Sequence, residues 1–155
     1  MKKEKTKNTH FTKEEKETSQ IAEKLALEIV KKKKSENAFV LALVGDLGAG
    51  KTAFTKGFAK SLGIKKVTSP TFVIFKPYSI SKKIKNFKTL YHVDCYRIKE
   101  IKELEVIRFY EILNNPENIV IIEWADRIKK IIPKNAKWIT ISHGKLETER
   151  KLAFK

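Results

Sequence analysis

The fold is decided by one stretch of the sequence, Gly45-Asp46-Leu47-Gly48-Ala49-Gly50-Lys51-Thr52, which fits the pattern G-x-x-x-x-G-K-[ST] at every fixed position. Glycines let such a loop curl until successive backbone N–H groups point at phosphate oxygens, and a helix that begins at the lysine adds its positive dipole end. The lysine then reaches the β- and γ-phosphates, and the threonine hydroxyl binds Mg²⁺. The N–H of Ala53 is expected to face the α-phosphate. The stretch therefore predicts a nucleotide-phosphate site, a P-loop.

The segments on either side of this loop supply the context that the pattern requires. Residues 38–44 form a continuous apolar run, which predicts a strand buried on both faces and therefore central in a parallel sheet. Residues 51–62 predict a helix that ends at Gly63. The predicted order is a buried strand, a glycine-rich turn and a helix. This context favours a phosphate-binding loop over a glycine turn that matches the motif by chance.

The rest of the chain predicts an α/β fold. Further strands are expected at residues 67–78, 89–95, 118–123, 138–142 and 150–154, with the first two and the last two paired as hairpins. Helices are expected at residues 13–33 and 128–132, the first behind a capping box that begins at Thr12, and one or two helices are expected at residues 100–113. We therefore expect a P-loop NTPase-like three-layer sandwich, with a mostly parallel central sheet and antiparallel hairpin extensions.

Length and composition narrow the class of protein further. The chain of 155 residues predicts a flexible basic segment over residues 1–12 and a single P-loop domain over residues 13–155. One cysteine, Cys95, excludes a disulfide framework and fits a reducing cytoplasm. No apolar run approaches the ~18 residues of a membrane span. No apolar segment follows the basic N-terminus, so it is not expected to be a secretory signal. We therefore expect no membrane partner.

The net charge of +16 invites a nucleic-acid interpretation. The 34 basic residues, however, are 30 lysines and only 4 arginines, and base readout and phosphate clamps favour arginine. The excess charge is therefore interpreted mainly as a solvated surface, which is compatible with RNA or an acidic protein nearby.

A P-loop needs a carboxylate for the magnesium ion, and two strand ends offer one. Glu123 follows four apolar residues, 119–122, and has the better Walker-B form, while Asp94 ends residues 90–94. Either could lie beside the loop. The neighbouring Trp124 is either a core residue or an aromatic wall near the nucleotide. His92, with Asp94 close by, could suggest a metal site, but no second His-rich segment completes it.

Four kinds of P-loop protein are considered at this point. A GTPase is excluded because no Asn-Lys-x-Asp guanine motif is present. A small-molecule kinase usually employs several arginines around its second substrate, and this chain has few. The remaining possibilities are an ATPase that drives a partner and a basic RNA-binding module that merely keeps a P-loop.

Four segments together resemble the TsaE family (also called YjeE), the small bacterial ATPases of tRNA threonylcarbamoyladenosine synthesis. They are the loop Gly45–Thr52, then Val67-Thr68-Ser69-Pro70-Thr71-Phe72, His92-Val93-Asp94-Cys95-Tyr96-Arg97, and Ile122-Glu123-Trp124-Ala125-Asp126-Arg127. The chain departs from the family at Cys95, often Leu, and at Ala53, often Thr. Neither change removes a side chain that the mechanism needs.

The resemblance implies a function and a set of roles. The family hydrolyses ATP weakly with Mg²⁺ and acts with TsaD and TsaB, which carry out the threonylcarbamoyl transfer to tRNA; TsaE would touch tRNA only through that complex. By motif position Lys51, Asp94 and Glu123 would be catalytic, and Thr52, Glu123 and Asp94 would hold Mg²⁺. The segment Thr68-Ser69-Pro70-Thr71 would form a γ-phosphate switch, and Thr18 and Trp124 would border the nucleotide.

Overall fold

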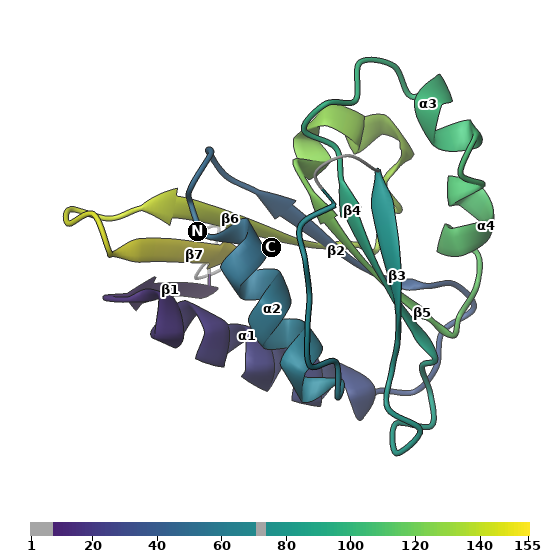
Figure 1. The fold of residues 1–155 in the computed structure, drawn as a ribbon, viewed down its shortest axis with the longest axis horizontal. Helices are drawn as coiled ribbons and strands as arrows, with labels where there is room; N and C mark the ends of the chain where they lie inside the picture. The colour runs from purple at the N-terminus through teal and green to yellow at the C-terminus, as the bar shows by residue number, and fades with distance from the viewer. Residues whose placement is uncertain (1–7, 71–73) are drawn as a thin grey trace, which may run out of the picture.

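The computed structural model describes residues 8–70 and 74–155 (Figure 1). Within these residues one seven-stranded sheet has the order β1-β7-β6-β2-β5-β4-β3. The strands are β1 Asn8–Thr12, β2 Phe39–Val44, β3 Phe75–Ser79, β4 Thr89–Asp94, β5 Asn118–Glu123, β6 Lys137–His143 and β7 Arg150–Phe154. The helices are α1 Glu15–Val30, α2 Lys51–Ser61, α3 Lys102–Glu105, α4 Phe109–Leu113 and the 3-10 helix η1 Ala125–Ile131.

The centre of the sheet is parallel and its two sides are antiparallel. Strands β6, β2, β5 and β4 run in one direction, while β3 at one side and β7 and β1 at the other run against their neighbours. The carboxyl ends of β2, β5 and β4 therefore meet at one edge, where ligands bind in open α/β sheets. The expected fold class is confirmed.

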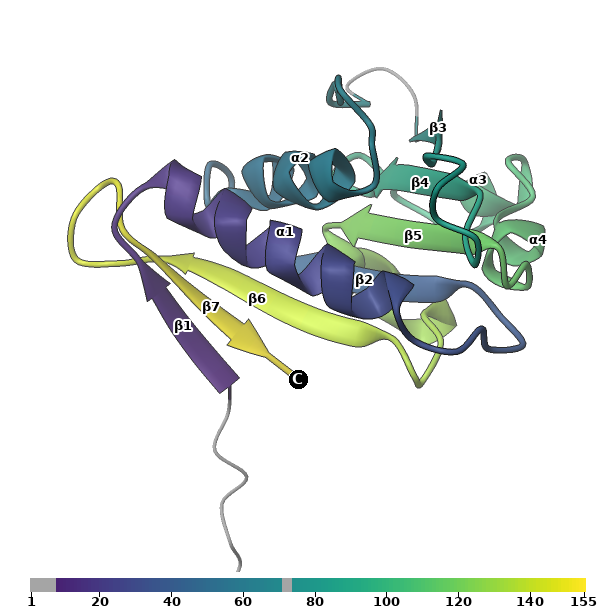
Figure 2. The same ribbon diagram turned by 90° about the horizontal axis from the view of Figure 1, so that it is seen from below.

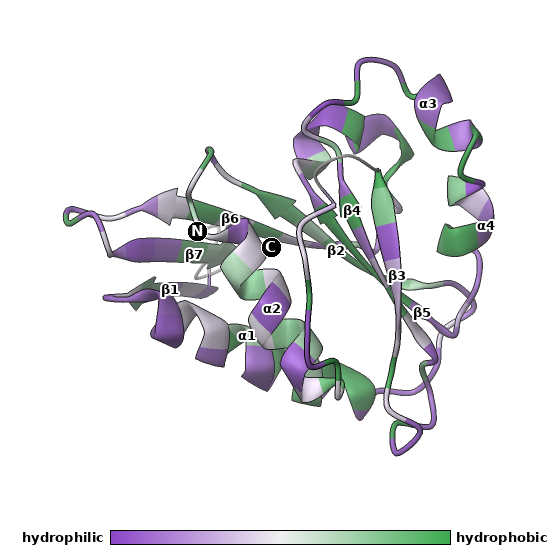
Figure 3. Cartoon of the chain, in the orientation of Figure 1, coloured by the Kyte–Doolittle hydropathy of each residue, from purple (hydrophilic) through white to green (hydrophobic). Residues whose placement is uncertain are grey.

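Helices cover both faces of the sheet, and the sheet divides the hydrophobic core in two. Figure 2 shows α1 and α2 side by side along one face, and α3, α4 and η1 pack on the other. In β5, Ile119 and Ile121 join the α1–α2 core, whereas Val120 and Ile122 join the opposite core. This double burial explains why residues 119–122 of β5 are all apolar, and Figure 3 shows the hydrophobic colouring of the central strands.

Helices α1 and α2 approach each other closely at Gly57. A Cβ atom at this position would lie 2.5 Å from the carbonyl oxygen of Ser19, a backbone atom that cannot easily move aside. The glycine thus allows α1 to lie directly against α2, and α1 in turn helps to fix the helix that begins at the phosphate loop. In the parts of the chain that the structure describes, no helix combines the length and the apolar character that a membrane span requires.

The N-terminal region differs from expectation. Residues 8–12 were expected to be flexible, but they form β1, which pairs with β7 from Asn8↔Phe154 to Thr12↔Arg150; residues 1–7 lie outside the described residues. Helix α1 begins at Glu15 rather than residue 13 and ends at Val30 rather than residue 33.

The expected capping box at Thr12 is not formed. The Thr12 hydroxyl instead lies 2.9 Å from that of Thr18, and the residue at the N-cap position of α1 is Glu14, which makes no side-chain cap hydrogen bond. The Lys13 N–H donates to the Glu17 carboxylate at 2.6 Å. Since Thr12 belongs to β1, its side chain is oriented by the sheet rather than by the helix.

Among the described residues of the extended segment expected at 67–78, only those from Phe75 onward form a strand. It pairs with β4 as the expected hairpin, and the part that precedes residue 71 is irregular. The helix expected after the loop ends as predicted, with Gly63 in the left-handed region at φ +79°. The C-terminal hairpin of β6 and β7 is also confirmed.

Candidate functional site

The loop between β2 and α2 has the geometry that a phosphate site requires. Gly50 adopts φ +104°, a conformation that favours glycine, and places the first turn of α2 directly behind the loop. The Ala49 N–H bonds to the Asp46 carbonyl at 3.0 Å, and Phe54 N–H bonds to the Gly50 carbonyl at 3.0 Å. The α2 N-terminus, with its unpaired N–H groups and dipole, therefore opens toward the carboxyl edge of the sheet.

Lys51 folds back over the loop that precedes it. Its Nζ donates to the carbonyl oxygens of Gly45 at 2.6 Å and Asp46 at 2.9 Å, and it lies 4.2 Å from the ring centroid of Trp124. Burial lowers the pKa of Lys51, and the nearby carboxylates, Glu123 first, oppose that shift. The ammonium group is thus held by weakly basic carbonyls, which a phosphate can replace as a stronger partner.

Glu123 lies at the end of β5 in a buried polar cluster. The Thr52 hydroxyl lies 3.3 Å from its Oε1, and the hydroxyl of Thr55 lies 3.5 Å from the same oxygen. His92 on β4, which is fully buried, lies 2.9 Å away through its Nε2. The carboxylate is therefore oriented toward the start of α2 by side chains from two other elements.

The Nδ1 atom of His92 makes no hydrogen bond within the described residues. A proton on Nε2 satisfies the contact with Glu123 and leaves Nδ1 as a bare lone pair. Nε2 can donate to the Glu123 carboxylate only when it carries a proton, so the contact between the two side chains requires a proton on this nitrogen.

Asp94 lies at the end of β4, opposite Glu123 in the parallel register. Its Oδ1 accepts the N–H of Tyr96 at 2.9 Å, and burial, the largest cause, raises its pKa. The next residue, Cys95, is buried, and burial raises the pKa of its thiol to about 12. The two carboxylates thus share one edge but differ in environment.

Trp124 turns the chain sharply after β5. It adopts φ +57°, which is uncommon for a residue with a side chain, and its ring lies 4.9 Å from that of Tyr96. The guanidinium of Arg127 lies 5.4 Å from the Tyr96 ring and 5.5 Å from the Trp124 ring. Together with Lys51 these side chains form an aromatic and cationic wall beside the loop.

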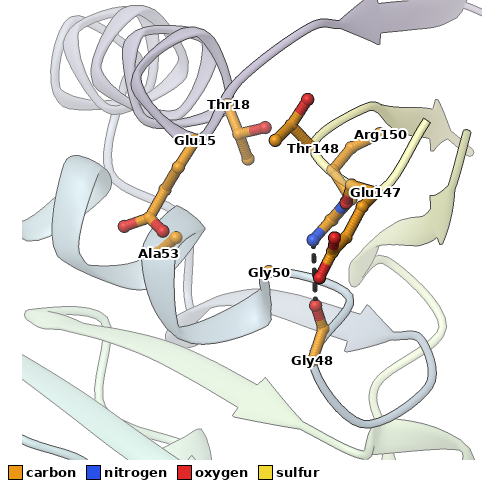
Figure 4. Close-up of a pocket in the computed structure, with 8 residues that line it drawn as sticks. All are labelled: Glu15, Thr18, Gly48, Gly50, Ala53, Glu147, Thr148 and Arg150. Atoms are coloured by element: carbon orange, nitrogen blue, oxygen red, sulfur yellow. Dashed lines mark hydrogen bonds between the residues drawn. The ribbon is translucent and has the colours of Figure 1, made fainter.

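One cavity of about 370 Å³ brings these groups together. Its lining includes residues of the loop, the start of α2, both strand ends and the segment before residue 71: Gly48, Gly50, Lys51, Thr52, Ala53, Ser69, Asp94, Tyr96, Glu123 and Trp124. A neighbouring cavity of about 270 Å³ lies between the starts of α1 and α2 and the β6–β7 turn, and Thr18 lines it (Figure 4).

The donor set in the first cavity suits a magnesium ion. The Thr52 hydroxyl and the carboxylates of Glu123 and Asp94 are hard oxygen donors that line the same space. Among the described residues no cluster of three or more His, Cys, Asp or Glu side chains could hold a metal by itself. This fits Mg²⁺, which is usually bound by one or two carboxylates together with substrate phosphates and water rather than in an all-protein cage.

Comparison with known proteins identifies the relatives of this chain. The family described as threonylcarbamoyl adenosine biosynthesis protein TsaE matches residues 12–152. The chain belongs to the TsaE family.

Individual members agree with this assignment. The TsaE protein of Borreliella burgdorferi is 42% identical over 62% of this chain and 66% of its own length, and that of Bacillus subtilis is 40% identical over 74% of this chain and 68% of its own length. The aligned regions thus cover about two thirds of these relatives. The crystal structure of Bacillus subtilis YdiB superposes with a TM-score of 0.68 at 33% identity, covering 96% of this chain and 84% of that one.

Most residues that the sequence singled out lie together in this TsaE-family chain. One cavity is lined by most of them: Leu47, Gly48, Gly50, Lys51, Thr52, Ala53, Asp94, Glu123 and Trp124. Three loop residues, Gly45, Asp46 and Ala49, are not among the residues that line it. Thr18 lies in the neighbouring cavity. Their roles stay predictions, since the geometry concerns position alone.

The predicted switch segment is only partly described. Ser69 lines the main cavity, and Pro70 is buried. Thr68 is held away from the loop, because its N–H donates to the Tyr78 hydroxyl at 3.1 Å and its own hydroxyl accepts from Lys76 at 2.6 Å. Thr71 lies outside the described residues.

Sequence reasoning missed four side chains at this edge. Tyr96 and Arg127 lie inside segments that carried the family resemblance, so they could have been considered as part of the wall. His92 was considered only as a metal ligand, not as the partner of Glu123. Arg150 comes from β7, about a hundred residues after the loop, and no local pattern connects the two.

Proposed function

We propose that this protein binds and hydrolyses MgATP to support threonylcarbamoyladenosine modification of tRNA. The observation that carries the proposal is the single cavity in which Lys51 and Thr52 face the carboxylates of Glu123 and Asp94. Membership of the TsaE family supports the pathway, and the P-loop geometry supports the nucleotide. Residues 13–155 would act as one ATPase domain, with β1 completing its sheet.

Each residue has a role that its position supports. Lys51 would leave the carbonyls of Gly45 and Asp46 and follow the γ-phosphate as negative charge shifts during transfer. The loop N–H groups and the α2 N-terminus would hold the other phosphates. A bound Mg²⁺ would supply Lewis-acid charge neutralisation at the phosphates.

The carboxylates would divide the remaining work. Glu123, fixed by His92 and close to the Thr52 hydroxyl, would hold the magnesium shell from the α2 side. Asp94, half-buried and less restrained, would orient the attacking water or the metal shell from the other side. The segment Thr68–Thr71 would respond to the γ-phosphate, since Ser69 already lies at the cavity wall.

The biological role would depend on partners. Hydrolysis would be slow in the isolated protein and would accelerate with TsaD and TsaB, in the cytoplasm, where it would support turnover of the transfer complex rather than the transfer itself. The protein would meet tRNA through that complex. The absence of an arginine cluster for a second small substrate supports this role over a kinase.

Radiolabelled ATP tests the proposal directly. Phosphate release is measured with the protein alone, with TsaD and TsaB, and with TsaD, TsaB and tRNA. Acceleration by the partners supports the proposal. Label transferred to a metabolite indicates a kinase instead, and salt-sensitive tRNA binding without turnover indicates an RNA-binding module.

A further inference from the structure

The phosphate loop is also contacted from the side of the neighbouring cavity, which Gly48, Gly50 and Arg150 line. When successive N–H groups of a loop converge on an anion, the carbonyl groups between them must point outward. Outward carbonyls in a packed loop need donors of their own. Ala49 is fully buried, and its neighbours Gly48 and Gly50 have φ values of +76° and +104°. This limb of the loop therefore combines one buried residue with two conformationally free glycines.

Arg150, the first residue of β7, supplies those donors. Its Nε donates to the Ala49 carbonyl at 2.9 Å and its Nη2 to the Gly48 carbonyl at 3.2 Å. Figure 4 shows the side chain reaching from the β6–β7 turn to the loop, with the Gly48 contact drawn as a dashed line. The loop is thus joined to a hairpin that follows it by about a hundred residues in the sequence.

The other end of the same guanidinium is bound within the hairpin. Its Nη1 donates to the carbonyls of Glu147 and Glu149. A guanidinium has five N–H donors and no acceptor, and these four contacts with backbone carbonyls occupy four of them. The group is therefore committed to backbone carbonyls and does not offer the paired donors with which an arginine grips a phosphate.

We propose that Arg150 is a positioning residue that keeps the phosphate loop in its nucleotide-binding conformation. The inference rests on the proposed nucleotide binding and adds a residue outside the four segments that mark the family. Lys51 also binds loop carbonyls, those of Gly45 and Asp46, but it is expected to move to the phosphates. Arg150 is then the restraint on the loop that remains when the nucleotide is bound.

Loss of the Arg150 contacts should weaken the affinity for the nucleotide and leave the rate of the chemical step unchanged. Without Arg150, the Gly48–Gly50 limb samples more conformations, and nucleotide binding must order it. Once the nucleotide is bound, its own contacts with the N–H groups hold the loop. In variants without Arg150, the dissociation constant for the nucleotide and the KM for ATP should therefore rise, while the turnover number at saturating ATP should change little.

The experiment compares Arg150→Met, Arg150→Lys and a matched control, Arg108→Met, in which an exposed arginine far from the loop is replaced. The dissociation constant of a fluorescent ADP analogue with Mg²⁺ is measured first, and then KM and kcat for ATP. We expect both Arg150 variants to raise the dissociation constant and KM by about tenfold, with kcat within about twofold of the parent and the control unchanged.

Arg150→Lys separates geometry from charge. Lysine keeps the positive charge but cannot span four carbonyls with a rigid fork, so it should behave like Arg150→Met. If the lysine variant binds like the parent, or if kcat falls while KM stays constant, the positioning role is wrong. If the parent protein itself binds no nucleotide, the proposed function fails first, which is a different result.

Amide hydrogen exchange provides a readout that does not depend on turnover. In Arg150→Lys the amides of the Gly48–Gly50 limb should exchange faster than in the parent, while those of β4 and β5 stay protected. Unchanged exchange in the loop would overturn the inference. Loss of protection throughout the sheet would also overturn it, because it would assign Arg150 to general stability.

Discussion

The ends of β4 and β5 look alike in sequence and differ in structure. Both strands run parallel, both end in a carboxylate, and Asp94 and Glu123 are register partners. Yet Glu123 is only 3% exposed and is surrounded by Thr52, Thr55 and His92. Asp94 is half-buried and accepts a single hydrogen bond, from the backbone of Tyr96, among the contacts of the described residues.

This difference separates two tasks that the motif alone does not distinguish. A carboxylate fixed by three side chains is pre-organised and loses little entropy when it takes part in binding. A carboxylate with one restraint and contact with water can adjust to a moving water molecule or metal shell. The following predictions test that separation and are ordered by the loss of hydrolysis that we expect.

Lys51→Ala should produce the largest loss, because Lys51 lines the cavity that both strand ends share and is proposed to follow the γ-phosphate. We expect kcat to fall roughly 100-fold or more, as for the loss of a strong transition-state donor. Lys60→Ala, an exposed lysine on the same helix, is the control and should retain activity. Parent-level hydrolysis by Lys51→Ala would show that the cradle assignment is wrong.

Glu123→Gln tests the pre-organised end. The substitution keeps the shape and removes the charge, so hydrolysis should fall by more than tenfold, about 1.4 kcal/mol of barrier. Binding of ADP without Mg²⁺ should be unchanged, since Glu123 is proposed to act through the metal. Loss of metal-free binding to the same extent would mean that the substitution disturbs the loop itself.

Asp94→Asn tests the adjustable end, and its activity and stability should change in opposite directions. Hydrolysis should fall by about tenfold. Burial raises the pKa of Asp94 in the folded state, so the ionised carboxylate costs folding free energy at neutral pH, and the amide avoids that cost.

The free energy of unfolding of Asp94→Asn should therefore exceed that of the parent at pH 7, by less than about 1 kcal/mol because the group is half in water. The difference should disappear as the pH falls below the unfolded-state pKa of 3.8, where the parent carboxyl is protonated in both states. Denaturant titrations at pH 7 and at pH 3 measure both values. Equal stability at pH 7 would show that burial of Asp94 costs nothing.

The last prediction concerns the residues that follow the two acids and involves no change in hydrolysis. Trp124 lines the cavity, whereas Cys95 is buried and burial raises the pKa of its thiol to about 12. At pH 8 the native thiol should react with an aromatic disulfide reagent at least about 100-fold more slowly than the unfolded chain does. Rapid native labelling would show that the end of β4 opens readily.

The fold could be predicted where burial and local pattern agree. β2 and β5 were recognisable because each is apolar on both faces, and α2 because a glycine precedes and follows it. β1 was missed because Asn8–Thr12 is mostly polar and exposed, and what makes it a strand is pairing with β7 at the other end of the chain. No local pattern carries that information.

The candidate site shows the same limit. Loop residues and strand-end acids follow from motif and strand direction. The pairing of His92 with Glu123, 31 residues apart, depends on how two strands align in register, and Arg150 depends on where a hairpin ends in space. Sequence reasoning named most of the groups that line the cavity and missed the side chains that contact them.

The contact between Arg150 and the loop also has a consequence for synthesis on the ribosome. Translation proceeds from the N-terminus, so the loop emerges about a hundred residues before the arginine that restrains it. The first strand must likewise wait for the last, since Asn8 pairs with Phe154, and such distant pairings form slowly. A nascent chain that has not reached residue 150 therefore carries the complete phosphate motif without its restraint. Nucleotide binding of full strength would then require a chain that extends past Arg150.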